Sequence, residues 1–187
     1  MGYRYFDSFD VPVSYPFGFG LSYTTFDYSD AKIAEKGDAY EVTVTIKNTG
    51  NHEGKEVVEL YISAPGAAKA AIKQEKSDAG IGSSEREQAR PEFIPVNKPV
   101  KELKAFAKTK LLKPGESETL KLTVKAADLA SFDEAASAWV VAEGEYQFLV
   151  AASAQDIKAT LTANAKAQQT KANDVMKPQG QMNLLKR

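Results

Sequence analysis

Alternation of apolar and polar residues is the feature that most limits what this chain can fold into. In Tyr40–Ile46 every second residue is apolar, and the same pattern recurs in Glu56–Ile62. A period of two places such side chains on one face of a β-strand. The stretch between the two runs, residues 48–54, is rich in Asn and Gly, which are turn residues. The pattern therefore predicts that the two strands form an antiparallel pair.

Strand patterns continue along most of the chain and predict an all-β fold. The mixed phase of Glu102–Leu112 predicts a β-bulge, and Lys113–Glu116 has Pro and Gly where a type II turn needs them. Residues Ala126–Ala136 are expected to form a short helical crossover. About seven short antiparallel strands are typical of an immunoglobulin-like or fibronectin type III-like sandwich. The predicted strands are Tyr40–Ile46, Glu56–Ile62, Glu102–Leu112, Thr119–Val124, Trp139–Val141, Tyr146–Val150 and Ile157–Ala163.

Two segments depart from this pattern. Residues 64–97 form an Ala-, Gly- and charge-rich insertion longer than ordinary loops, within which Ser84–Arg90 weakly favours a helical turn. Residues 168–187 show no strand pattern, so we expect a C-terminal tail that docks on a neighbouring domain or is disordered alone. The predicted organisation is a junction at 1–25 with an irregular N-terminal segment, a sandwich at 26–166 that contains the 64–97 insertion, and a tail at 167–187.

Aromatic residues crowd the stretch that precedes the first strand. Each of them can bury a large apolar area against a partner, so we expect them to pack against another domain; packing on the base of the sandwich is the alternative. Gly18 and Gly20 reach φ values that other residues avoid, which makes them candidates for an interdomain hinge. The packing candidates are Tyr15, Phe17, Phe19, Tyr23 and Phe26.

Composition and residue spacing exclude several classes of function. The formal net charge is −1, so nucleic acid is not an expected partner. The chain has no cysteine, which rules out disulfides, thiolate catalysis and cysteine zinc sites. It has no apolar run of about 18 residues, so no membrane span is expected.

The single histidine, His52, lies in a turn and is predicted to be an exposed loop residue. One histidine and scattered acids show neither a Ser-His-Asp arrangement nor metal-ligand spacing. We therefore predict no catalytic residue, no metal and no cofactor in this chain. Trp139 is predicted to lie in the core, since the rival role of stacking on a sugar would need an exposed ring.

Residues Gly2–Asp7 and Tyr15–Phe26 resemble the end of the second catalytic domain of family-3 glycoside hydrolases, the β-glucosidase and β-xylosidase family. In that family the segment leads into a fibronectin type III-like domain. The likeness covers roughly residues 2–163, although the 64–97 insertion is longer than the common family pattern. The matching motifs that follow are Val44–Gly50, Gly54–Ile62, Lys98–Phe106, Leu112–Glu116, Asp128–Asp133 and Gly144–Tyr146.

The resemblance implies a parent enzyme that hydrolyses β-linked glucosides or xylosides with retention, using an Asp nucleophile and a Glu acid/base on upstream catalytic domains. No position here matches either catalytic motif, so this fragment alone is not expected to be an enzyme. Its implied role is a non-catalytic accessory domain that packs against the catalytic domains of the same polypeptide, which take the oligosaccharide substrate. The 64–97 insertion is the part best able to reach the active-site entrance.

Two alternative functions stay open from the sequence. One is an autonomous carbohydrate-binding module, and the other is a protein-interaction or adhesion sandwich. The residues do not fix the compartment; a periplasmic or extracellular parent is our expectation.

Overall fold

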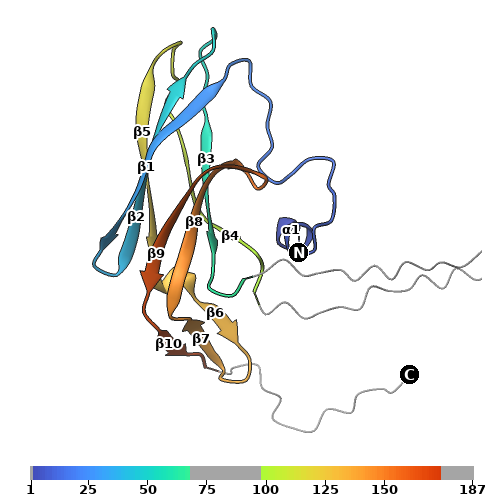
Figure 1. Cartoon of the computed structure of the whole chain (residues 1–187), viewed down its shortest axis with the longest axis vertical. Coiled ribbons are helices and arrows are strands. Elements are labelled where there is room, and N and C mark those ends of the chain that lie inside the picture. The colour runs from blue at the N-terminus through green and yellow to red at the C-terminus, as the bar shows by residue number, and fades with distance from the viewer. Residues whose placement is uncertain (1, 68–97, 174–187) are drawn as a thin grey trace, which may run out of the picture.

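A two-layered sandwich of antiparallel sheets dominates the computed structural model, which describes residues 2–67 and 98–173 (Figure 1). One sheet has the strand order β1-β2-β5 and the other β4-β3-β8-β9. The predicted all-β sandwich is confirmed. The predictions for most of the 64–97 insertion, for Ser84–Arg90 and for the end of the tail lie outside the described residues. The strands are β1 (Phe26–Lys36), β2 (Ala39–Asn48), β3 (Val57–Ser63), β4 (Glu102–Lys108), β5 (Ser117–Lys125), β8 (Gly144–Ser153) and β9 (Asp156–Ala165).

The core lies between the two sheets and is built from the alternating residues of their central strands. The Tyr40 ring of β2 lies 5.1 Å from the Phe148 ring of β8, which links the layers. Each buried apolar side chain contributes about 25 cal/mol per Å² removed from water. The largest fully buried aliphatic side chains are Ile46, Leu60, Leu112, Val42, Val44, Val58, Val124, Val141 and Val150.

The expected pairing of the two first predicted strands is wrong. Strand β2 pairs with β1 and β5, whereas β3 pairs with β4 and β8, so the two strands belong to opposite sheets. The alternation of apolar and polar residues shows which face of a strand is buried but not which strand it pairs with. Both strands turn their apolar faces toward the same core, one from each sheet. Residues 49–56 therefore form a corner between the sheets rather than a hairpin.

Asn48 is the polar centre of that corner and is fully buried. Its Nδ2 donates to the carbonyls of His52 and Leu112, both at 2.8 Å. Its Oδ1 accepts from the Thr24 hydroxyl at 2.6 Å and from the Gly50 amide at 3.1 Å. One side chain thus connects the corner, the chain entering β1 and the loop before β5. The His52 side chain is exposed, as predicted.

The predicted bulge and turn are both confirmed. Leu60 pairs with Ala105 while Tyr61 pairs with Leu103, which leaves Lys104 as the extra residue of a bulge in β4. In the turn, the Glu116 amide donates to the Lys113 carbonyl at 2.9 Å. Gly115 has a φ of +81°, the value that a type II turn needs at this position.

Gly115→Ala is expected to lower the free energy of unfolding by about 1 kcal/mol. A Cβ there would meet nothing within 4 Å, so the cost comes from the positive φ alone. Chemical denaturation measures the change. Gly20→Ala is the matched control, because a Cβ there also meets nothing and Gly20 has no positive φ. An equal loss in both variants would contradict this explanation.

A second, smaller sheet lies at one end of the sandwich (Figure 1). It has the order β10-β7-β6, with bounds β6 (Ser131–Asp133), β7 (Ala138–Val141) and β10 (Gln168–Lys171). The helical crossover expected at Ala126–Ala136 is only the 3₁₀ helix η1 (Ala126–Leu129), followed by β6. The start of the expected tail is strand β10, which its polar sequence did not indicate.

Trp139 does not lie in the core, and its prediction is wrong: half of the side chain, 50%, is exposed. Strand β7 belongs to the small sheet, where only Ala138 and Val141 are buried. The strand itself was predicted, but the sequence did not show that its large residue is half exposed.

Candidate docking surface

The N-terminal segment (residues 2–25) lies on the outer face of the four-stranded sheet and covers β3. It begins with a short helix, α1 (Tyr3–Ser8), in a stretch that was predicted to be irregular. The Tyr3 ring contacts the rings of Tyr61 at 5.6 Å and Phe17 at 5.0 Å. Glu59 and Tyr61, on the outer side of β3, are buried, so β3 is covered on both of its faces.

The bulge in β4 helps to build this contact. Ala105 and Ala107 pack against the main core, whereas Leu103 packs with Tyr61 in a second cluster on the outer side. An unbroken strand would place Leu103 and Ala105 on the same face. The extra residue, Lys104, moves Leu103 to the face that Tyr3 covers.

Polar contacts fasten the N-terminal segment at several points along its length. They include main-chain donors of the sandwich and a largely buried ion pair between Asp7 and Lys101 at 3.0 Å. The segment is therefore part of the folded body rather than a free linker. The main-chain contacts are Leu103 N to Tyr3 Oη at 2.7 Å, Val100 N to Ser8 Oγ at 3.0 Å and Ala154 N to the Phe17 carbonyl at 2.8 Å.

Gly18 lies directly on the Glu59 side chain. A Cβ at Gly18 would lie 2.6 Å from the Glu59 carboxyl carbon, and the φ of Gly18 is +81°. Both facts require glycine at this position. Gly20 has neither a positive φ nor a close neighbour, so the backbone argument applies only to Gly18. A hinge at these two glycines stays a prediction.

Four of the five predicted packing residues are exposed to solvent. Tyr15 and Tyr23 are exposed at 71% and 96%, and Phe17 and Phe19 are also exposed. The Tyr15 and Phe19 rings contact each other, with their centroids 5.1 Å apart and their planes tilted by 37°. Phe26, in contrast, packs against the main core of the sandwich.

Several exposed apolar residues were not singled out by the sequence analysis, and three of them are assigned to this surface. Leu21 belongs to the N-terminal segment, while Val57 and Phe106 lie on β3 and β4. Phe106 is the direct cross-strand partner of Glu59, so it lies beside the position that Gly18 covers. The sequence did contain a signal for Phe106: it lies between Ala105 and Ala107, which face the core, so in a strand its own side chain faces outward. The docking surface is defined here as Tyr15, Phe17, Phe19, Leu21, Tyr23, Val57 and Phe106.

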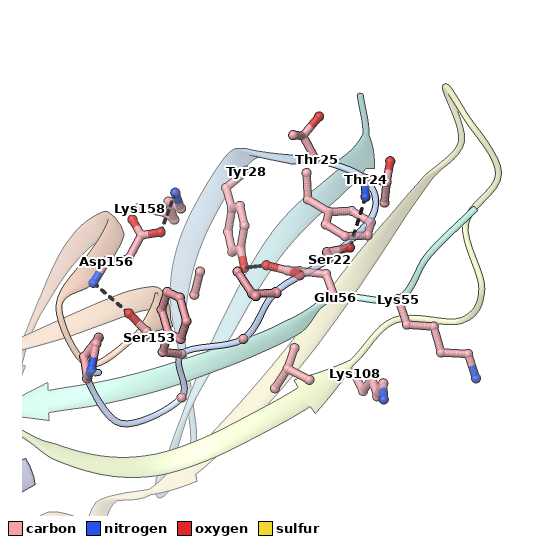
Figure 2. A pocket seen from close by; sticks show the side chains of 18 of the residues that line it. Ser22, Thr24, Thr25, Tyr28, Lys55, Glu56, Lys108, Ser153, Asp156 and Lys158 are labelled. Carbon is pink, nitrogen blue, oxygen red and sulfur yellow. Dashed lines mark hydrogen bonds and ion pairs between the residues drawn. The ribbon is translucent and has the colours of Figure 1, made fainter. Parts of the chain in front are cut away.

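A groove of about 720 Å³, lined by both polar and apolar side chains, runs between the N-terminal segment and the loop that joins β8 and β9. Figure 2 shows the Tyr28 hydroxyl pointing to Glu56, to which it donates at 2.8 Å. Across the groove, Lys158 pairs with Asp156 at 2.9 Å, and the Asp156 amide donates to Ser153 Oγ. Burial raises the pKa of Glu56, and the Tyr28 hydrogen bond opposes this shift. The groove thus places the charged side chains of Glu56, Asp156 and Lys158 next to the docking surface.

Glu59→Gln is expected to raise the melting temperature at pH 7 and to leave it unchanged near pH 4. Burial raises the pKa of Glu59 in the fold, only partly offset by the Tyr61 hydroxyl that donates at 2.7 Å. A raised pKa contributes stability below the unfolded value of about 4.3, and this stability is lost as pH rises through the folded pKa. Thermal unfolding between pH 4 and pH 7 measures the difference.

Glu41→Gln provides a control of opposite sign. The ammonium groups of Lys36 at 2.7 Å and Lys121 at 3.2 Å hold the pKa of Glu41 below its usual value. This group therefore stabilises the fold above the unfolded pKa, and its removal lowers the melting temperature at pH 7. If both variants shifted in the same direction, the electrostatic argument would fail.

Within residues 2–67 and 98–173, no three His, Cys, Asp or Glu side chains are grouped to hold a metal ion. Over the same ranges no helix is long and apolar enough to cross a membrane.

Comparison with known proteins relates this geometry to a family. Residues 89–154 match the fibronectin type III-like domain family. Among curated relatives, β-glucosidase BoGH3A of Bacteroides ovatus is 36% identical over 166 residues, which cover 87% of this chain and 18% of that protein. A β-glucosidase of Rhizobium radiobacter is also 36% identical, over 87% of this chain and 17% of its own length.

Solved structures give the same result. β-Glucosidase 3B of Thermotoga neapolitana, in complex with α-D-glucose, matches with a TM-score of 0.73 and 40% identity over 91% of this chain and 20% of that one. The GH3 β-glucosidase of Bifidobacterium adolescentis matches with a TM-score of 0.70 and 32% identity over 95% of this chain and 23% of that one. The chain thus spans about a fifth of the length of the relatives it matches.

Proposed function

This chain carries the fibronectin type III-like domain of family-3 glycoside hydrolases, and from this we propose its function. The domain is a non-catalytic accessory part of a β-glycosidase. It braces the catalytic domains of the same polypeptide through the docking surface. The parent enzyme hydrolyses β-linked glucosides or xylosides, a class suggested by the β-glucosidases that the chain resembles.

The observation that carries this proposal is the exposure of aromatic side chains on a segment that is itself firmly held. A monomeric protein rarely leaves a contiguous apolar patch larger than a few hundred Å² in water unless the patch binds something. The backbone of the N-terminal segment is fixed by hydrogen bonds to the sandwich, yet Tyr15, Phe19 and Tyr23 point to solvent. Rigid exposed aromatics of this kind are typical anchors of an interface.

The position of the surface in the chain supports a catalytic domain as its partner. The exposed aromatics lie on the segment that precedes β1 in the chain. This segment resembles the end of the second catalytic domain of family-3 glycoside hydrolases, which favours that domain as the partner. The charged side chains of the adjoining groove, such as Lys158, would form the polar rim that interfaces commonly have.

The double substitution Tyr15→Ala and Phe19→Ala tests the proposal in the complete enzyme. We expect a fall of several degrees in its melting temperature, because burying two aromatic anchors contributes about 2 kcal/mol or more each. In the 187-residue chain alone the same change should shift the melting temperature little, since both rings are exposed there. Differential scanning calorimetry of the two proteins measures the contrast.

Leu111→Ala is the matched control, because Leu111 is an exposed apolar residue outside the docking surface. It should have little effect in either protein. An unchanged melting temperature of the complete enzyme after the double substitution would reject the bracing role.

Catalysis is tested separately with an aryl β-glucoside. The complete polypeptide is expected to cleave it, and the 187-residue chain is not. Turnover by the purified chain alone would overturn the non-catalytic assignment.

A further inference from the structure

An exposed aromatic pair lies on the small sheet, and the proposed bracing role makes no use of it. Trp139 of β7 and Phe132 of β6 are direct cross-strand partners. Their rings contact at 5.4 Å with an interplanar angle of 66°, so the edge of one ring meets the face of the other. Both side chains are about half exposed. The small sheet lies at the end of the sandwich opposite to the turn by which the chain enters β1 (Figure 1).

A hollow of about 240 Å³ adjoins the Trp139 side chain. Strand register explains its shape: Trp139 pairs with Thr170 and Val141 pairs with Gln168, so these four residues lie on one face of the small sheet. Ala127 and Ala130, around η1, complete the lining. The hollow therefore combines an apolar floor, one aromatic wall and a rim with one amide and one hydroxyl.

The polar groups of this rim have no partner within the described ranges 2–67 and 98–173. No hydrogen bond to the Gln168 amide or to the Thr170 hydroxyl is found there. Both residues lie on β10, whose backbone pairs with β7, so their positions are set by the sheet. They are two donor and acceptor groups held at the edge of an apolar surface.

We propose that this hollow binds one pyranose ring of a β-linked glycan, stacked on the Trp139 indole. A pyranose with equatorial hydroxyls has an apolar C–H face and a rim of hydroxyls. The C–H face can stack on the Trp139 indole, and the hydroxyls can form hydrogen bonds with the Gln168 amide and the Thr170 hydroxyl. The volume is below the range of roughly 300–1,000 Å³ typical of larger ligands, which suits a single ring.

The identity of the sugar rests on the proposed function, whereas the stacking site rests on the geometry of the small sheet. A protein partner is the alternative occupant. Pressing an apolar protein surface onto the hollow would bury the Gln168 amide and the Thr170 hydroxyl unpaired, which is unfavourable. A hydroxyl-rich ligand satisfies both groups, and this favours the sugar.

Tryptophan fluorescence gives a direct test, because Trp139 is the only tryptophan of the 187 residues. Titration with cellobiose is expected to produce a saturable change in emission with a millimolar Kd. Gln168→Ala and Thr170→Val should each raise that Kd about fivefold, the effect of one lost hydrogen bond. Phe106→Ala, an exposed aromatic on the docking surface, should leave it unchanged.

Two results would overturn this proposal. One is the absence of a saturable change at about 100 mM cellobiose; the other is a change that persists undiminished in both β10 variants. Both variants change residues of an exposed strand, so they are not expected to prevent folding and the test stays valid. A complete enzyme destabilised by Gln168→Ala, without sugar binding, would assign the hollow to a protein contact instead. None of these results bears on the docking surface, so the two proposals fail independently.

Discussion

Phe148→Ala is expected to lower the free energy of unfolding of this chain by about 3–5 kcal/mol. Phe148 is fully buried on β8, and its ring contacts Tyr40 across the two sheets. Truncation removes the apolar contact and leaves a cavity that rigid strands on both sides cannot close. Since the free energy of unfolding of a small domain is about 5–15 kcal/mol in total, the urea concentration at the midpoint of unfolding should fall by a large amount.

Phe106→Ala makes the same chemical change at a site that is 71% exposed, and it serves as the control. In the isolated chain its effect should stay within about 0.5 kcal/mol. In the complete enzyme it should become destabilising if the docking surface is covered by a catalytic domain. A comparable loss for Phe106→Ala and Phe148→Ala in the isolated chain would contradict the burial described here.

Asn48→Ala is expected to cost about 3 kcal/mol or more, although it removes little apolar area. The side chain makes four hydrogen bonds, and its loss leaves buried partners unsatisfied, at about 1–3 kcal/mol each where water cannot replace it. Asn48→Asp should also be strongly destabilising, because a carboxylate cannot donate to the carbonyls of His52 and Leu112. Equilibrium unfolding of both variants measures these changes.

Asn164→Ala is the control, because the Asn164 side chain lies exposed on β9. It should be nearly neutral. A small effect of Asn48→Ala would mean that solvent reaches the corner between the sheets and replaces the lost bonds.

Sequence periodicity was sufficient to predict the strands and the class of fold, because burial on one face leaves a period of two. It was insufficient to predict the partners of those strands. The residues of β2 and β3 were predicted to form a hairpin, yet the two strands face each other across the core, and the Asn48 side chain fills the corner between them with hydrogen bonds. Turn chemistry was more reliable, since Gly115 is required by a local φ value and not by distant contacts.

The candidate sites divide in the same way. The aromatics of the N-terminal segment were recognisable because they cluster in sequence, whereas Val57 and Phe106 join them only through strand pairing. Trp139 was assigned to the core because large apolar residues usually lie there. Its strand belongs to the small sheet and not to the sandwich, and β10, the polar strand beside it, has no apolar alternation that periodicity could detect.

The two-sided burial of β3 has a consequence for where this unit can be cut. A polypeptide shortened to start at Phe26 would keep every strand of both large sheets but would lose Tyr3 and expose the apolar side chains of Tyr61 and Leu103. Such a truncated protein should be less soluble and its central strand should exchange amide protons faster. The smallest stable piece is therefore larger than the sandwich that gives the fold its name, and engineered fusions should retain the helix that begins at Tyr3.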